Sequence, residues 1–163
     1  TERRRRQLND LRMRNQGAAL DRPEVRMSTV GAVARDVKGT VAAGTSTGGL
    51  TGKAPGRVGD APLIGAGPLA DNRCGAISAT GSGEIFIRTR VASQICDAAR
   101  FGKVPLQKAA DATMAEVLAL GGDGGVIVLG PTGDGLFSFN SPGMYRGRAS
   151  AKGPREIKVY GDE

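Results

Sequence analysis

Short runs in which small or apolar residues alternate with polar ones predict several β-strands along the chain. Residues 29–36 and 40–45 are both rich in small and β-branched residues. The turn signal Val37-Lys38-Gly39 between them predicts a β-hairpin. The same kind of patterning predicts further strands over residues 73–80, 125–129, 136–140 and 156–160.

Three segments have the composition or spacing of helices. Apolar residues recur at helical intervals over residues 85–100, which predicts one continuous helix, and again over 105–120, where Gly121-Gly122 ends the pattern. Residues 1–16 contain good helix formers with a thin apolar stripe. Strands mixed with helices in this order predict an α/β fold.

Two irregular segments divide this pattern. Residues 17–28 contain Gly, Pro and mixed charges without a period, which predicts a linker between a leading helix and the main domain. The chain is therefore divided into residues 1–28 and 29–163. Residues 45–60 are dense in Gly, Thr and Pro, and a loop of this length in a compact domain is usually functional. Residues 61–71 are expected to continue it irregularly.

The absence of histidine restricts the possible chemistry. It excludes Ser-His-Asp and Cys-His catalysis and removes the commonest zinc ligand. A catalytic base would have to be a carboxylate, a lysine, a tyrosine or a chain-terminal amine.

The two cysteines, Cys74 and Cys96, are too few for a disulfide scaffold and are expected to be buried thiols in a reducing cytoplasm. The sequence contains no run of eighteen apolar residues, so no membrane span is expected.

The net charge of +7 is concentrated at the start of the chain. Residues 1–28 hold eight arginines against four acidic residues, whereas residues 29–163 are nearly balanced. The run Arg3–Arg6 is more typical of the solvated face of a surface helix than of a nucleic-acid site. No nucleic-acid partner is expected, and a basic nucleic-acid module remains the weakest alternative.

Two glycine-rich motifs suggest phosphate or anion binding. A P-loop requires a glycine five residues before a Gly-Lys pair and Ser or Thr after it, but Gly52-Lys53 is preceded there by Thr47 and followed by Ala54. This hypothesis is rejected. The turn 80–83 (TGSG) lies between a predicted strand and a predicted helix, where backbone amides favour anions. A tight turn that lets strand and helix pack is the more usual explanation.

Three threonines, Thr29, Thr47 and Thr80, lie at strand ends or in the glycine-rich loop. An internal threonine is a poor nucleophile and most often simply fills a strand. An N-terminal threonine differs, because its free amine has a pKa of about 7.7–8.0 and can act as the base for its own hydroxyl.

Five sequence blocks resemble one known family. The chain after Thr29 is similar to the β-subunit of plant-type L-asparaginases, also called isoaspartyl peptidases, which are N-terminal-nucleophile hydrolases. PGRVGD preceded by TSTGG is highly specific, and TGSGE favours the plant type over the glycosylasparaginases. The blocks are TVGAVARD (29–36), GTSTGGLTGKAPGRVGDAPLIGAG (44–67), SATGSGEIFIR (78–88), LGGDGG (120–125) and FNSPGMYR (139–146).

The resemblance implies a four-layer αββα sandwich, only part of which this chain covers, and roles for specific residues. It implies that the precursor cleaves itself between Ser28 and Thr29, giving an α-subunit that ends in residues 1–28 and a β-subunit of 29–163. The implied roles are Thr29 as nucleophile, Thr47 as the threonine that tunes it, Thr80 and Gly81 as oxyanion hole, Arg57 for the substrate carboxylate, and Asp60 with the Gly83 carbonyl for its ammonium.

The same resemblance implies hydrolysis of L-asparagine and β-aspartyl peptides without a metal or organic cofactor, in an assembly of two αβ pairs. The family usually has Gly where this chain has Ser28, and its precursors carry a longer region before the nucleophile. The rest of the α-subunit is therefore expected as a partner. Glycosylasparaginase, a threonine endopeptidase, and an unprocessed non-catalytic fragment remain alternatives.

Overall fold

The computed structural model describes residues 1–13, 29–133, 135–151 and 153–162. The predicted linker, including Ser28, lies outside the described residues. The elements in chain order are α1 (Glu2–Met13), β1 (Thr29–Arg35), β2 (Val41–Thr47), β3 (Pro68–Asp71), β4 (Gly75–Gly81), α3 (Gly83–Thr89), α4 (Val91–Arg100), α5 (Leu106–Ala119), β5 (Gly124–Leu129), β6 (Gly135–Phe139), β7 (Arg146–Arg148) and β8 (Glu156–Lys158). The α/β class is confirmed.

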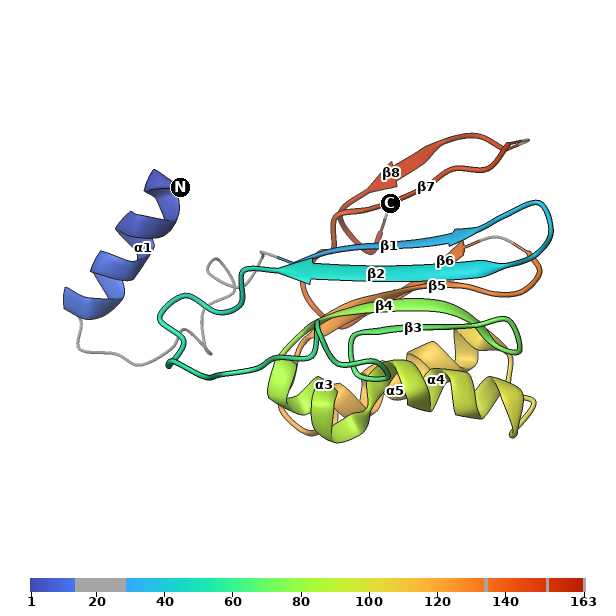
Figure 1. Cartoon of the computed structure of the whole chain (residues 1–163), viewed down its shortest axis with the longest axis horizontal. Coiled ribbons are helices and arrows are strands. Elements are labelled where there is room, and N and C mark those ends of the chain that lie inside the picture. The colour runs from blue at the N-terminus through green and yellow to red at the C-terminus, as the bar shows by residue number, and fades with distance from the viewer. Residues whose placement is uncertain (14–28, 134, 152, 163) are drawn as a thin grey trace.

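An antiparallel sheet in the order β3-β4-β5-β6 forms the centre of the molecule. Helices α3, α4 and α5 cover one face of this sheet, and the β1–β2 hairpin lies against the other (Figure 1). Strand β4 is buried from Gly75 to Ala79 because both of its faces are covered. Helices α3–α5, the four-stranded sheet and the β1–β2 hairpin thus make three layers, and β7 and β8 form a separate two-stranded sheet.

The helical layer carries most of the core. Ile77 and Val126 from the sheet pack with Phe86, Ile95 and Val117 from the three helices, and none of these side chains is exposed. Among the described residues, no helix has the length and apolar character needed to cross a membrane.

The hairpin is held on the sheet at several points. The Thr45 and Ser78 hydroxyls lie 2.7 Å apart at the centre, and at the far end Arg35 donates to the carbonyls of Gly130 and Gly133. A Cβ on Gly31 would lie 2.2 Å from Ser78 Oγ, so only glycine permits this close approach. The predicted hairpin is confirmed, and its register is fixed against the sheet.

The outer face of the hairpin consists of small and apolar residues, and it is exposed. The side chains that point away from the central sheet alternate along both strands, as expected from the pleat. They are Val30, Ala32 and Ala34 on β1 and Ala42, Gly44 and Ser46 on β2.

The continuous helix predicted over 85–100 is wrong in one respect: it is two helices. Arg90 has a left-handed backbone (φ 50°) that ends α3 and begins α4. This conformation costs roughly 1–2 kcal/mol for a residue other than glycine. Burial of Val91 and Ala92, and the hydrogen bond from Ser93 N to Gly65 O, favour the reoriented helix. The apolar spacing persists across the break and so conceals it.

Two strands were not predicted. Residues 68–71 were expected to be irregular but form β3, an edge strand that begins at Pro68 and pairs with β4. Strand β7 has only three residues, Arg-Gly-Arg. Proline is tolerated at the first position of an edge strand. Neither segment was predicted because neither is long enough to show an alternation of apolar and polar residues.

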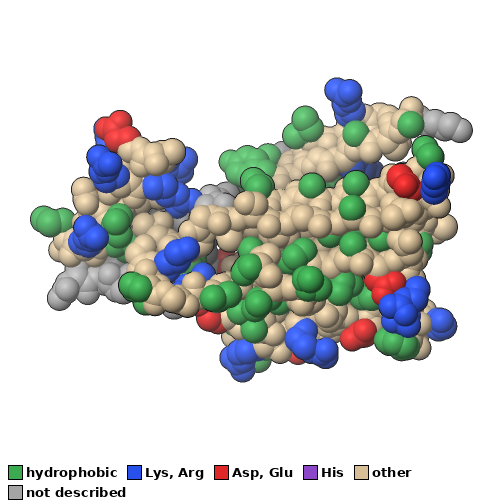
Figure 2. Space-filling model, in the orientation of Figure 1, with side chains coloured by type: hydrophobic (Ala, Val, Ile, Leu, Met, Phe, Trp, Pro, Cys, Tyr) green, Lys and Arg blue, Asp and Glu red, His purple; other side chains and the backbone are tan. Residues whose placement is uncertain are grey.

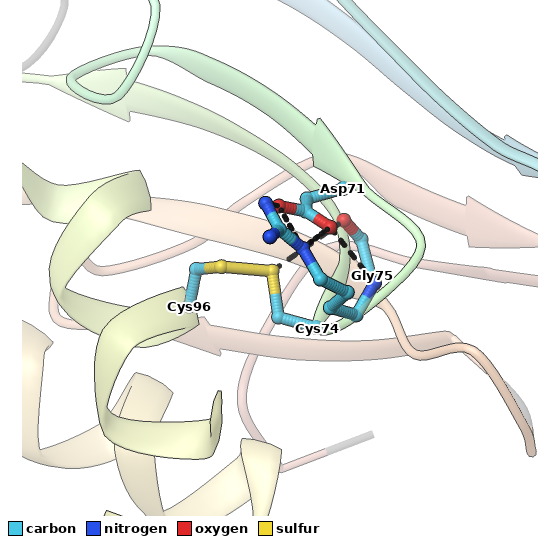
Figure 3. A network of polar contacts seen from close by, with 5 residues as sticks. Asp71, Cys74, Gly75 and Cys96 are labelled. Carbon is cyan, nitrogen blue, oxygen red and sulfur yellow. Dashed lines mark hydrogen bonds and ion pairs between the residues drawn. A yellow bond between two sulfur atoms is a disulfide. The ribbon is translucent and has the colours of Figure 1, made fainter. Parts of the chain in front are cut away.

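The expectation of two free thiols is wrong, because Cys74 and Cys96 form a disulfide (Figure 3). Cys74 precedes β4 beside the Asp71–Arg73 ion pair, and Cys96 lies on α4, with the two Cα atoms 5.3 Å apart. Both are nearly inaccessible in the core. A disulfide removes the thiol-based argument for a reducing cytoplasm, so the cytoplasmic location stays a prediction without that support.

Candidate active site

Thr29 and Thr47 face each other at one end of the hairpin. They are partners in the β1–β2 register, and their hydroxyl oxygens are 3.2 Å apart. The Thr29 hydroxyl donates to Thr47 Oγ1, which also accepts the Gly49 amide at 3.0 Å. The predicted nucleophile is therefore the first residue of β1, with a second hydroxyl in hydrogen-bonding contact.

Thr80 and Gly81 end β4 on the same side of the molecule. They pair with Gly125 and Gly124 of β5, so the backbone here is lined by glycines. A Cβ on Gly81 would lie 2.2 Å from the Asp123 carbonyl oxygen and 2.5 Å from the Phe86 ring. The Asp123 carbonyl and the Phe86 ring can therefore lie against the end of β4 only because Gly81 has no side chain.

The turn after Thr80 joins the strand to the helix tightly. Ser82 N donates to the Asp123 carbonyl at 2.9 Å, and Ser82 Oγ donates to the Asp123 carboxylate at 3.0 Å. Ile85 N and Phe86 N both donate to the Ser82 carbonyl. These contacts support the tight-turn explanation of residues 80–83.

Arg57 is held by a carboxylate that the sequence analysis did not single out. Its Nε and Nη2 donate to the two Glu84 oxygens at 2.7 and 2.9 Å. This pairing raises the pKa of Arg57 and lowers the pKa of Glu84, in both cases mainly through the shared hydrogen bonds. The guanidinium is thus fixed in orientation. Glu84 is the last residue of the TGSGE motif. Its position directly after the glycine turn is the sequence signal that could have identified it as a site residue.

Asp60 is buried and incompletely satisfied. The residue is 7% exposed, and Oδ2 has no hydrogen-bond partner among the described residues. Burial raises the pKa of the carboxyl, while backbone amides and the Arg57 guanidinium partly oppose this shift. A buried oxygen without a partner is unfavourable by about 1–3 kcal/mol. A ligand that donates a hydrogen bond would remove this penalty.

Gly83 lies against both charged groups. A Cβ there would meet Arg57 Nη2 at 2.9 Å and Asp60 Oδ1 at 3.0 Å. Glycine at this position therefore keeps space for the guanidinium and the carboxylate to lie side by side.

Two cavities meet at Thr29. The smaller, of about 360 Å³, is lined by Thr47, Arg57 and Asp60, and the larger, of about 840 Å³, is lined by Thr80. Thr29 and Gly81 line both. The structure thus brings every predicted site residue except Ser28, which lies outside the described residues, to one region. The threonine hydroxyl stands between a charged polar cavity and a larger one.

Two arginines of the run in α1 make side-chain contacts within the chain. Arg6 pairs with Glu2 one turn away, and Arg4 donates to Gln7 Oε1 and Thr51 Oγ1. In Figure 2, basic side chains lie around α1 and are otherwise interspersed with acidic ones. These contacts favour the surface-helix interpretation.

Comparisons with known proteins connect this geometry to a family. A family model described as asparaginase matches residues 1–159. The chain is 49% identical over 138 residues to an isoaspartyl peptidase of Salmonella typhimurium, covering 84% of this chain and 44% of that protein. It is 50% identical over 131 residues to an isoaspartyl peptidase of Escherichia coli, covering 80% and 40%.

A plant protein is also similar. A probable isoaspartyl peptidase/L-asparaginase of Arabidopsis thaliana is 43% identical over 132 residues, which are 81% of this chain and 40% of the plant protein. The chain therefore spans less than half the length of these relatives.

Proposed function

Because the chain belongs to the asparaginase family, we propose that it forms the catalytic part of a self-processing amidohydrolase. Its substrates are L-asparagine and β-aspartyl peptides, whose carbonyl carbon is attacked by Thr29. One observation carries the proposal: the Thr29–Thr47 hydroxyl pair lies where the charged cavity of Arg57 and Asp60 meets the larger cavity beside Thr80.

Cleavage of the Ser28–Thr29 bond creates the base. The freed amine of Thr29 has an ordinary pKa of about 7.7–8.0, so a useful fraction is unprotonated at neutral pH. It accepts the proton of its own hydroxyl as the oxygen attacks. Thr47 accepts a hydrogen bond from Thr29 in the structure, and its own hydroxyl can donate in return once Thr29 Oγ1 becomes negative.

The charged cavity holds the amino-acid end of the substrate. Arg57, oriented by Glu84, presents a guanidinium to the α-carboxylate. The unpartnered Oδ2 of Asp60 accepts a hydrogen bond from the α-ammonium, and the Gly83 carbonyl assists. A cation and an anion side by side select a zwitterion and direct its side chain toward Thr29.

The reaction then has two stages. The tetrahedral oxyanion is stabilised by the Thr80 hydroxyl and the Gly81 amide, and each such donor is worth about 3 kcal/mol in a transition state. The protonated Thr29 amine gives its proton to the leaving nitrogen as the C–N bond breaks, so ammonia or the amine of the second residue leaves. Water, deprotonated by the same amine, then hydrolyses the aspartyl ester on Thr29, and the proton returns to the Thr29 hydroxyl. The reaction needs no metal or organic cofactor.

The exposed outer face of the hairpin supports a partner. Its small and apolar side chains form a surface suited to be covered by helices. We propose that the N-terminal part of the precursor, ending in residues 1–28, supplies further strands beside the hairpin and a second helical layer over its outer face. The result is the four-layer αββα sandwich, and two αβ pairs form the assembly.

The test is the intact mass of the full-length protein under denaturing conditions, together with ammonia release from L-asparagine. A fragment beginning at Thr29, activity in the wild type and none in Thr29→Ala would support the proposal. Thr40→Ala, in the hairpin turn, is the matched control. Cleaved protein that hydrolyses only N-acetylglucosaminyl-asparagine would favour a glycosylasparaginase. If the protein is uncleaved and inactive, Ser28→Gly is tested: recovery of cleavage and activity would mean that Ser28 blocks processing, and no recovery would contradict the proposal.

A further inference from the structure

The larger cavity has a volume that ammonia release does not require. This inference rests on the proposed function. The charged cavity would hold the amino-acid end of the substrate, and Thr29 also lines a second cavity of about 840 Å³, so the leaving group is expected to depart into that cavity. Ammonia is about the size of a water molecule, which takes roughly 30 Å³. The larger cavity can therefore accommodate a whole second residue.

The lining of this cavity is largely apolar. Asp123 and Arg3 are the charged residues among the described lining, and the Asp123 carboxylate already accepts a hydrogen bond from Ser82 Oγ. The apolar residues that line it include Leu50, Ile127, Pro142, Met144 and Tyr145. This composition favours a leaving residue with an apolar side chain.

Met144 is an apolar residue of this lining that lies against the strand beside Thr80. A Cβ on Gly125 would lie 2.5 Å from Met144 Sδ, so the thioether lies directly over Gly125. Gly125 is the strand partner of Thr80, the proposed oxyanion donor. Met144 therefore lies next to the strand partner of the proposed oxyanion donor, within the cavity into which a leaving residue would extend.

The segment that carries Met144 is anchored at both its amide and its carbonyl. Met144 N donates to Val159 O at 2.8 Å, and Met144 O accepts from Arg146 Nη1 at 3.2 Å. The Arg146 guanidinium also stacks 4.9 Å above the Phe139 ring. A methionine held in this way presents a defined yet adaptable apolar surface.

We propose that Met144 is a specificity-determining residue for the leaving group. It contacts the side chain of the second residue of a β-aspartyl dipeptide and favours apolar residues there. Gly125 provides the space in which the thioether lies. L-Asparagine releases only ammonia and does not reach this contact.

The experiment compares Met144→Ala, Met144→Leu and the wild type in the full-length protein. The kcat/KM values are measured for β-aspartyl-leucine, β-aspartyl-glycine and L-asparagine. We expect Met144→Ala to lose about tenfold or more on β-aspartyl-leucine, the effect typical of an altered apolar pocket. The other two substrates should change less than about twofold, and Met144→Leu should keep the preference, since it conserves volume. Met13→Ala, exposed on α1, is the matched control.

Each outcome decides one question. Retained L-asparagine activity in Met144→Ala shows that the variant is folded, so a selective loss on β-aspartyl-leucine supports the subsite. An equal loss on all three substrates, or no loss on β-aspartyl-leucine, overturns the subsite while the proposed function stands. A wild-type protein that hydrolyses none of the three overturns both.

Discussion

The hydroxyl oxygens of Thr29 and Thr47 lie 3.2 Å apart because the two residues are direct partners across the β1–β2 hairpin. Their contact is therefore a property of strand register. It does not depend on a loop that closes over the site.

Removal of the Thr47 hydroxyl should reduce catalysis while leaving the fold intact. Thr47→Val keeps the β-branched shape in the strand but cannot donate to the Thr29 oxygen. We expect kcat to fall by about 10- to 100-fold, the effect of one hydrogen bond of about 1.5–3 kcal/mol to a charged group. Steady-state ammonia release, with intact mass as a check on processing, measures this.

Thr40→Val is the control for this substitution, because Thr40 lies in the hairpin turn at the opposite end from Thr47. Equal kcat values for the two variants would mean that the Thr47 hydroxyl does not act on Thr29.

Asp60→Asn should lower activity and raise stability. Burial raises the pKa of Asp60, so the folded state holds this proton more tightly than the unfolded chain does. The group therefore makes the fold less stable as the pH rises from the usual carboxyl range toward the raised folded pKa. The side chain in Asp60→Asn does not ionise, so this variant does not lose stability in that pH range. We expect its Tm to exceed that of the wild type at neutral pH without substrate.

The same change removes the anion that binds the substrate ammonium. We expect kcat/KM for L-asparagine to fall at least about tenfold, as for loss of one partner of a buried charge pair. In the wild type, kcat/KM should decline as the pH falls through the raised Asp60 pKa. A wild-type profile without this decline, or a variant that is less stable than the wild type, would contradict the assignment.

Gly31→Ala should loosen the hairpin from the sheet. Its Cβ would lie 2.2 Å from Ser78 Oγ, so either the hairpin or Ser78 must move. We expect a loss of about 1–3 kcal/mol in the free energy of unfolding, typical of an overpacked contact. Gly44→Ala, with no atom within 4 Å of its Cβ, should be nearly neutral.

Denaturant unfolding of both glycine variants tests this, and Ser78→Ala should partly rescue Gly31→Ala. If Gly31→Ala and Gly44→Ala changed the free energy of unfolding equally, the close contact between Gly31 and Ser78 would be contradicted.

Loss of the Cys74–Cys96 disulfide should destabilise the fold. The two residues are 22 apart in sequence, and closing a loop of that size is worth about 3 kcal/mol in the chain-entropy account. We expect a lower Tm with reductant in the wild type and no effect of reductant on Cys74→Ala/Cys96→Ala. Thiol labelling of the folded, non-reduced protein is the direct check, because two labelled cysteines would exclude the bond.

Much of the fold follows from local patterning because the elements are regular. The hairpin from Thr29, the strand that ends near Thr80 and the helix that precedes Gly121 all appear in the periodicity. The break at Arg90 does not, because a left-handed arginine is stabilised by packing far away in sequence. Nor does the disulfide, because two cysteines carry no information about their distance.

The site divides in the same way. The positions of Thr29, Arg57 and Asp60 came from motif resemblance, and the structure brings them together. The Arg57–Glu84 pairing and the unpartnered Asp60 oxygen are tertiary facts. They depend on how residues 48–67 pass across the start of α3. The spacing of residues along the sequence does not specify that path.

The register of the hairpin also constrains how related sequences can vary in length. Because successive residues of a strand point to opposite faces, a single insertion or deletion within β1 would turn Thr29 to the outer face and separate its hydroxyl from Thr47. Such changes should be eliminated by selection inside the hairpin strands. Natural length variation should instead collect after Gly49, in the loop that precedes Arg57, where one added residue leaves the nucleophile in place.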